Sequence, residues 1–93
     1  MRRAAKTDAS QSAIVERLRE IGAWVRPTHQ IGQGFPDLLV YARGRLFLIE
    51  VKEPGEKLNK LQAAFLEHCP CEVHVVRTPE EAVLAAIGKE AMI

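Results

Sequence analysis

A glycine-containing turn between two apolar runs is the feature of this sequence that most constrains its fold. The two runs and the segment that joins them are Leu38-Leu39-Val40-Tyr41, Leu46-Phe47-Leu48-Ile49 and Ala42-Arg43-Gly44-Arg45. Runs rich in strand-forming residues on either side of a short turn with glycine are typical of a β-hairpin. If Arg43 and Gly44 form the turn, Asp37 falls opposite Glu50 on the neighbouring strand.

This register places acidic side chains together on one face of the hairpin. Directly opposed residues have Cβ atoms about 4.5 to 5.5 Å apart, and like charges so placed repel each other. Lys52 follows Glu50 by two positions, so the alternation of a strand returns it to the same face. Asp37, Glu50 and Lys52 are therefore the candidate site.

A structural interpretation of the same residues is that Asp37 belongs to a turn and that Glu50 and Lys52 form a solvated ion pair. Against it, Phe47, Ile49 and Val51 make the other face of the second strand apolar as well, so we expect this strand to be buried on both faces. Charged residues on a buried strand usually have a partner or a function. We therefore favour a functional site.

Length and composition predict one small domain. The chain has 93 residues, of which 47% are hydrophobic, and we expect a single domain over residues 1–93 with a basic tail over about 1–7. It contains no apolar run long enough for a membrane span and no hydrophobic signal core, so we expect a cytosolic protein.

The net charge of +1 argues against a globally basic protein. DNA binding would therefore depend on local clusters of positive charge. The candidate clusters are Arg2, Arg3 and Lys6 in the tail, and Lys57 and Lys60 beside Lys52.

The remaining patterns predict the order helix, strand, strand, strand, helix, strand, helix. Asp8 or Ser10 is expected to cap the first helix, which Gly22 ends. A strand over 23–26, stopped by Pro27, and a flexible loop over 28–35 come before the hairpin. A further strand over 72–76 leads to a helix that Thr78 caps, with Pro79 at its first position and Glu81 closing a capping box. The order predicts an α/β domain with a central mixed sheet flanked by helices.

Two glutamines can each serve as a helix cap or as part of the site. Gln11 extends the buried stripe of the first helix and is a candidate to reach the carboxylates, but it also has capping-box spacing from Asp8. Gln62 has the same spacing from Asn59, at the start of the helix after Lys52. Both roles remain open for each glutamine.

These residues together resemble the virus-type replication-repair nuclease domain, VRR-NUC, of the PD-(D/E)xK nuclease superfamily. The resemblance covers nearly the whole chain, and three segments carry it: Gly34-Phe35-Pro36-Asp37, Glu50-Val51-Lys52 and Leu58-Asn59-Lys60-Leu61-Gln62. It implies a restriction-endonuclease-like αβββαβ core. It also implies DNA repair in a bacterial or phage-infected cell.

The resemblance implies that Asp37 and Glu50 bind Mg²⁺ or Mn²⁺ with help from the backbone carbonyl of Val51. Lys52 then positions or activates the attacking water, and Gln62 lies near the scissile phosphate. Carboxylates suit Mg²⁺, and a bound ion lowers the pKa of water and neutralises charge on the phosphate.

Family members usually carry a glutamate on the first helix, eleven residues before its terminal glycine, where this chain has Gln11. An amide binds metal less strongly than a carboxylate. We therefore expect Gln11 to act through a bound water or as an orienting group.

The implied activity is a metal-dependent, structure-selective DNA endonuclease that acts as a homodimer on branched DNA, like a Holliday-junction resolvase. Two alternatives are a flap or end-directed nuclease, and a non-catalytic DNA-binding module that retains the nuclease fold.

Two other polar features are given structural interpretations. The segment His68-Cys69-Pro70-Cys71-Glu72-Val73-His74 has thiols and imidazoles, but its spacing matches no common zinc knuckle, and free thiols are favoured. His29, in the loop before the hairpin, could contact phosphate, although a plain loop histidine is favoured.

Overall fold

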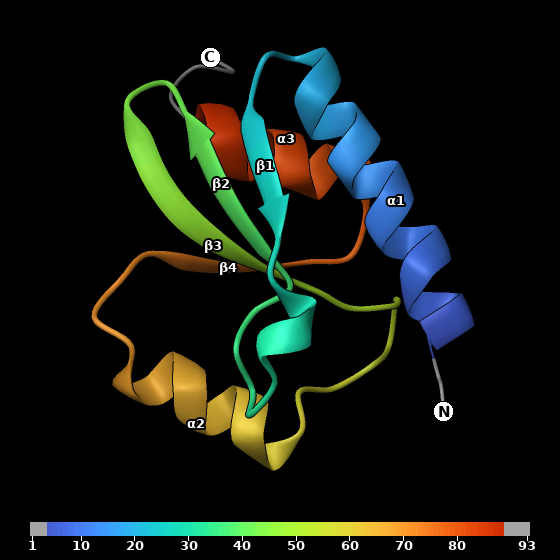
Figure 1. The fold of residues 1–93 in the computed structure, drawn as a ribbon, viewed down its shortest axis with the longest axis vertical. Helices are drawn as coiled ribbons and strands as arrows, with labels where there is room; N and C mark the ends of the chain where they lie inside the picture. The colour runs from blue at the N-terminus through green and yellow to red at the C-terminus, as the bar shows by residue number, and fades with distance from the viewer. Residues whose placement is uncertain (1–3, 89–93) are drawn as a thin grey trace.

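The computed structural model describes the backbone of residues 4–88 and the side chains of residues 9–88. Its elements follow the predicted order, with one short 3₁₀ turn added (Figure 1). They are α1 (Ala4–Glu20), β1 (Trp24–Pro27), η1 (His29–Ile31), β2 (Leu38–Ala42), β3 (Arg45–Val51), α2 (Lys60–His68), β4 (Val73–Val76) and α3 (Pro79–Ile87). In this part of the chain, no helix has the length and apolarity to cross a membrane.

The four strands form one sheet in the order β1-β2-β3-β4. The first two pairings are antiparallel and β4 runs parallel to β3, which confirms the mixed sheet. Tyr41 pairs with Leu46 and Leu39 with Leu48, as predicted. Arg43 and Gly44 both have positive φ, 51° and 79°. This conformation defines the two-residue turn that matches strand twist. The pairing extends from Ala42–Arg45 to Leu38–Ile49, and Asp37 and Glu50 are the residues that adjoin its last pair.

Helices α1 and α3 pack together on one face of the sheet (Figure 1). This face forms the hydrophobic core, to which α1 contributes Ile14 and Leu18 and α3 contributes three alanines. The small alanine side chains let α3 lie close to the strands. Phe47, Ile49 and Val51 all point into this core, as predicted.

The second face of β3 differs from expectation. Leu48 and Glu50 are buried there, but Leu46 is 59% exposed. Helix α2 lies at the carboxylate end of the hairpin, away from the turn (Figure 1). The prediction of burial on both faces is therefore wrong near the turn and right near the carboxylates.

The start of α1 also differs from expectation. The helix already includes Ala4, so Asp8 and Ser10 lie within it and neither caps its start. Alanine-rich sequence favours helix strongly enough to continue through these polar residues. The capping role for Gln11 with Asp8 is therefore excluded, and the helix begins inside the segment expected to be a basic tail.

Two smaller predictions need correction. Thr78 caps α3 as expected, because its hydroxyl accepts a hydrogen bond from Glu81 N–H at 3.1 Å. The Glu81 carboxylate, however, accepts from Arg77 N–H at 2.6 Å, so it does not complete a capping box with Thr78. Strand β1 includes Pro27 instead of stopping before it. A proline is compatible with an edge strand because one side of such a strand needs no donor.

Candidate metal centre

The site lies where β2 begins and β3 ends. Asp37 immediately precedes β2, and its backbone N–H donates to Ile49 O at 3.0 Å. Its side chain reaches across the hairpin, where Oδ2 accepts a hydrogen bond from Val51 N–H at 2.8 Å. The strand pairing thus fixes the Asp37 carboxylate and occupies one of its two oxygens.

Glu50 is only 2% exposed. Its Oε2 accepts a hydrogen bond from Gln62 Nε2 at 3.0 Å, whereas Oε1 is buried and has no hydrogen-bond partner within the described structure. A buried carboxylate oxygen without a partner is costly. This oxygen is suited to a ligand that the protein itself does not supply.

Gln62 has both of the roles that the sequence left open. Asn59 Oδ1 accepts from Gln62 N–H, and Gln62 Oε1 accepts from Asn59 N–H, each at 2.9 Å, which completes the capping box at the start of α2. Because the cap uses Oε1, the amide NH₂ group is turned towards Glu50. The cap therefore orients the catalytic candidate.

Lys52 lies on the same face as Glu50 and is 7% exposed. Its Nζ pairs with Glu56 Oε2 at 3.6 Å. The structural interpretation, a solvated Glu50–Lys52 pair, therefore fails, because both residues are buried and the ion-pair partner of Lys52 is Glu56. Sequence reasoning gave Glu56 no role.

A small cavity of about 90 Å³ joins these groups. It is lined by Ser10, Asp37, Glu50, Val51, Lys52, Glu53, Glu56 and Gln62. A water molecule takes about 30 Å³ in the liquid. The cavity therefore has room for one ion with a few waters. It is too small to enclose a nucleotide, which could approach it only from outside.

The electrostatics of the two carboxyl groups are strongly coupled. Burial, followed by the charge of Asp37, raises the pKa of Glu50 to about 8, although Lys52 opposes this shift. Burial also raises the pKa of Asp37, against the lowering effect of the Val51 N–H hydrogen bond. Near neutral pH the metal-free pair therefore retains a proton.

The donor set fits a hard divalent cation. Asp37 and Glu50 are each held through one oxygen, which leaves the second for a metal, and the proton kept by the pair is one that a cation would displace. Nowhere in residues 9–88 do three or more His, Cys, Asp or Glu side chains gather as a metal-binding group. Of the four carboxylates that line the cavity, Glu53 accepts from Ser10 and Glu56 pairs with Lys52, which leaves Asp37 and Glu50 as the two best placed to hold a cation.

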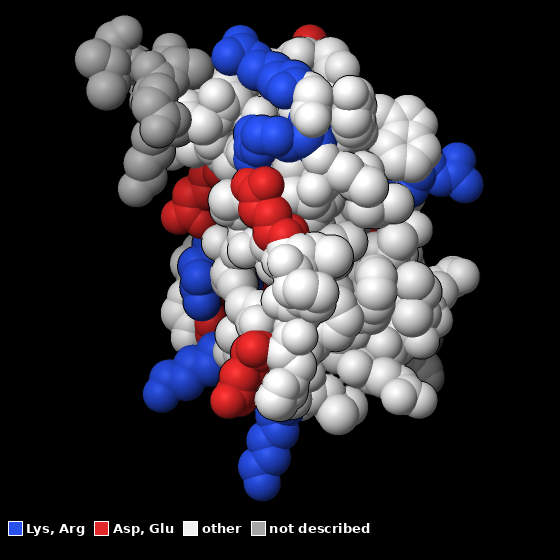
Figure 2. All heavy atoms as spheres, turned by 90° about the vertical axis from the view of Figure 1, so that its left-hand side faces the viewer, with Lys and Arg blue, Asp and Glu red and all other residues white. Residues whose placement is uncertain are grey.

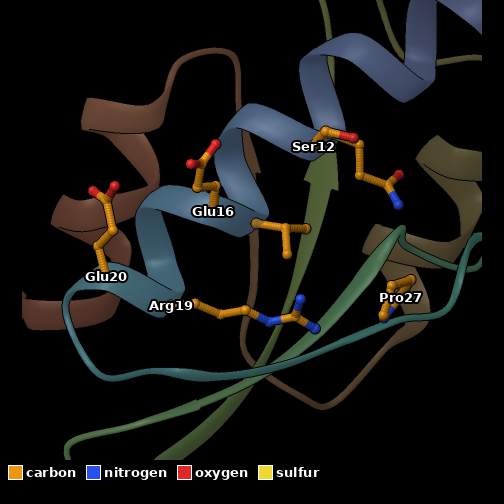
Figure 3. A pocket seen from close by; sticks show the side chains of 7 residues that line it. Ser12, Glu16, Arg19, Glu20 and Pro27 are labelled. Atoms are coloured by element: carbon orange, nitrogen blue, oxygen red, sulfur yellow. The ribbon is translucent and has the colours of Figure 1, made fainter.

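Gln11 lies near the site but does not line the cavity. Its Nε2 is 3.2 Å from His29 Nδ1, and its buried Oε1 has no partner in the described chain. It borders a larger hollow of about 630 Å³ between α1 and β1, into which Arg19 extends toward Pro27 (Figure 3). That hollow lacks opposed buried carboxylates, so we assign the chemistry to the smaller cavity.

Sequence reasoning missed three residues that line the cavity, Ser10, Glu53 and Glu56. His29 does not line the cavity, although its charge, like that of Lys52, opposes the burial that raises the pKa of Asp37. Ser10 Oγ donates a hydrogen bond to Glu53 Oε2, which ties α1 to the cavity wall. The alternation that revealed Lys52 stops at the end of β3, and no local pattern marks Glu53.

The other candidates lie away from the cavity. Cys71 N–H donates to Cys69 Sγ at 3.4 Å, and His74 Nε2 lies 2.6 Å from Glu72 Oε2. Neither contact joins this segment to the carboxylates.

The positive clusters are only partly described. Lys57 and Lys60 are exposed. Arg2 and Arg3 lie outside the described residues, as does the side chain of Lys6. The face shown in Figure 2 carries basic and acidic side chains interspersed along its length, with basic groups at its upper and lower ends.

A mixed sheet with flanking helices and opposed acids at the end of its central hairpin defines a restriction-endonuclease-like nuclease fold. The profile of the VRR-NUC domain matches residues 3–79, and the chain belongs to this family. A solved structure described as a VRR_NUC domain is similar, with 28% sequence identity and a TM-score of 0.71. The match covers 89% of this chain and 97% of that one. A search of curated proteins found no match.

Family membership implies a nuclease-type function in DNA processing, and with it DNA binding. Nucleases of this family generally depend on a divalent metal.

The raised pKa of Glu50 predicts a loss of stability with rising pH in the metal-free protein. Above the ordinary value of 4.5, the unfolded glutamate has released its proton, whereas the folded group retains it until about pH 8. The free energy of unfolding should therefore fall between these values and then level off. The free energy of unfolding of Glu50→Gln should fall less over the same range. Urea unfolding in EDTA at pH 5.5 and 8.5 measures this difference.

Glu16→Gln, at an exposed position on α1, is the matched control and should follow the wild-type curve. Equal pH dependence in wild type and Glu50→Gln would show that Glu50 is not the group responsible.

Proposed function

We propose that this protein is a metal-dependent, structure-selective DNA endonuclease that hydrolyses phosphodiester bonds and acts like a Holliday-junction resolvase. The observation that carries the proposal is the opposition of Asp37 and Glu50 in a small cavity beside buried Lys52. Each carboxylate has one oxygen held by a fixed donor. Membership of a nuclease family supports the same reaction.

In this proposal Asp37, Glu50 and the Val51 carbonyl hold Mg²⁺ or Mn²⁺. When bound, the ion supplies a water of lowered pKa and positive charge beside the phosphate. Lys52 adds a second cation to the same cavity, where it orients the attacking water. Gln62 holds Glu50 Oε2 and so keeps Oε1 directed to the ion.

Two further roles complete the site. Gln11 acts through a water or by orienting His29, since its amide lies 3.2 Å from that ring. Exposed Lys57 and Lys60 precede or begin α2, the helix that carries Gln62, and we assign them to the DNA backbone together with Arg3 and Lys6. Contacts of this kind add affinity without reading sequence.

The first prediction of this proposal concerns activity. Purified protein with Mg²⁺ or Mn²⁺ should cut a labelled four-way junction, and Glu50→Ala or Lys52→Ala should lower kcat by at least about 100-fold because each removes a charge that acts on the reacting phosphate. The variants should retain the wild-type circular dichroism spectrum. Glu67→Ala, at an exposed position on α2, is the control and should remain active.

The same assay separates the alternatives within the enzyme class. Symmetric incision at the junction supports a resolvase, whereas products confined to flaps or ends indicate a flap or end-directed nuclease. A wild-type protein that cuts neither duplex, flap nor junction DNA with either metal would exclude the nuclease.

Metal binding distinguishes the nuclease from a non-catalytic module with the same fold. Calorimetry should show Mn²⁺ binding to the wild-type protein, and Asp37→Asn or Glu50→Gln should weaken it at least about tenfold because each removes a charged ligand. Glu80→Gln, on the exposed face of α3, is the control. Binding that is absent, or indifferent to both site variants, favours the DNA-binding module.

We also propose that the protein is a homodimer, since symmetric incision of a four-way junction needs two sites. Trp24, Tyr41 and Leu46 are 51%, 49% and 59% exposed. Their pairing across β1, β2 and β3 places them in one row on the face that carries Glu50. Adjacent exposed apolar groups of this kind commonly mark an interface.

Sedimentation should therefore report a dimer, and Tyr41→Lys should shift it to monomer because a buried unpaired charge opposes association. Leu84→Lys, at an apolar position on α3 that is 37% exposed, serves as the matched control and should stay dimeric. A monomeric wild type at micromolar concentration would contradict the dimer and leave the metal site unaffected.

A further inference from the structure

Helix α2 carries Gln62, yet it buries none of its own side chains. Most helices are held in place by a buried apolar face. The position of α2, and with it the contact between Gln62 and Glu50, must therefore depend on contacts of another kind. The loop before β2 supplies them.

This loop contains a tight turn over residues 32–35. Phe35 N–H donates to Gly32 O at 3.0 Å, and the two central residues, Gln33 and Gly34, have φ of 57° and 81°. These values resemble the 51° and 79° of Arg43 and Gly44 in the hairpin. The chain thus contains two turns of similar conformation, one of which meets α2.

Gly34 touches the backbone of α2 directly. A Cβ atom on Gly34 would lie 2.4 Å from Leu61 O and 3.0 Å from Gln62 N. Only glycine permits this approach. The peptide that Gly34 contacts is the one that joins Leu61 to Gln62.

The next residue makes a second contact with the same helix. The rings of Phe35 and Phe65 are 5.1 Å apart and nearly perpendicular, at 69°. This is a favoured arrangement for aromatic pairs. Phe65 lies three positions after Gln62, so the turn contacts α2 on both sides of the glutamine.

We propose that Gly34 and Phe35 are positioning residues that hold α2 so that Gln62 reaches Glu50. The effect on catalysis rests on the proposed nuclease function, whereas the effect on the Gln62–Glu50 contact does not. In this arrangement the turn that leads into Asp37 also sets the orientation of Glu50, through α2. One segment thereby aligns both carboxylates.

The distances show that a small displacement is enough to break the contact. To bring a Cβ on Gly34 from 2.4 Å to 3.0 Å from Leu61 O, one of the two backbones must move by about 0.6 Å. The bond from Gln62 Nε2 to Glu50 Oε2 is 3.0 Å long. Lengthening it by the same amount places it beyond the range of a hydrogen bond.

The test compares Gly34→Ala with Gly44→Ala. Both substitutions place a side chain at a positive φ in a similar turn, but nothing lies within 4 Å of a Cβ on Gly44. The difference between the variants therefore reports the collision with α2, free of the common backbone strain. Phe65→Leu removes the ring contact without backbone strain and serves if Gly34→Ala does not fold.

The first measurement is solvent exchange of the Gln62 side-chain amide by nuclear magnetic resonance, in the absence of metal and DNA. Exchange should be at least about tenfold faster in Gly34→Ala than in wild type, because the hydrogen bond to Glu50 is lost. Phe65→Leu should change it in the same direction. Gly44→Ala should stay within about threefold of wild type.

The second measurement is junction cleavage. Gly34→Ala should lower kcat by about 10- to 100-fold with KM changed less than about threefold. In a Gln62→Ala background the same substitution should add less than about threefold, because the group it positions is gone. If Gly34→Ala lowered kcat only by disturbing the fold, its whole effect would also appear in the Gln62→Ala background.

The two proposals fail in different ways. An inactive wild type refutes the nuclease but leaves amide exchange readable. Unchanged exchange in a folded Gly34→Ala protein, or a full additional loss of activity in the Gln62→Ala background, overturns the positioning role.

Discussion

The structure depends on the register of one hairpin. The turn at Arg43 and Gly44 determines which residues of β2 and β3 face each other, and a shift by one residue would send every side chain to the other face of the sheet. With the observed register, the apolar residues of β3 meet α1 and α3. The same hairpin brings Asp37 and Glu50 together in one cavity on the other face.

The pair of buried carboxyl groups opposes folding, whereas the rest of the domain favours folding. Two carboxyl groups are desolvated beside each other, and one of them has an oxygen without a partner. The fold compensates in part through Lys52, through Val51 N–H and through the amide of Gln62. Such a local conflict, inside an otherwise consistent fold, is expected at a functional site.

Helix α2 shows how local and tertiary interactions are combined. Its capping box is a local interaction that fixes the orientation of the Gln62 amide. The approach of Gly34 then fixes where the helix stands relative to the sheet. Neither interaction alone directs Gln62 Nε2 to Glu50, because one sets the rotation of the side chain and the other sets the position of its backbone.

The sequence by itself determined the features that depend on near neighbours. The hairpin register, the alternation that places Lys52 beside Glu50, and the capping boxes all follow from spacings of a few residues. The structure shows the register, the alternation and the capping box at the start of α2. It does not show the capping boxes predicted at the starts of α1 and α3. Tertiary structure decided the contacts between distant segments: Ser10 with Glu53, Gln11 with His29, and Gly34 with α2. These depend on how packed elements approach in space, which no local periodicity encodes.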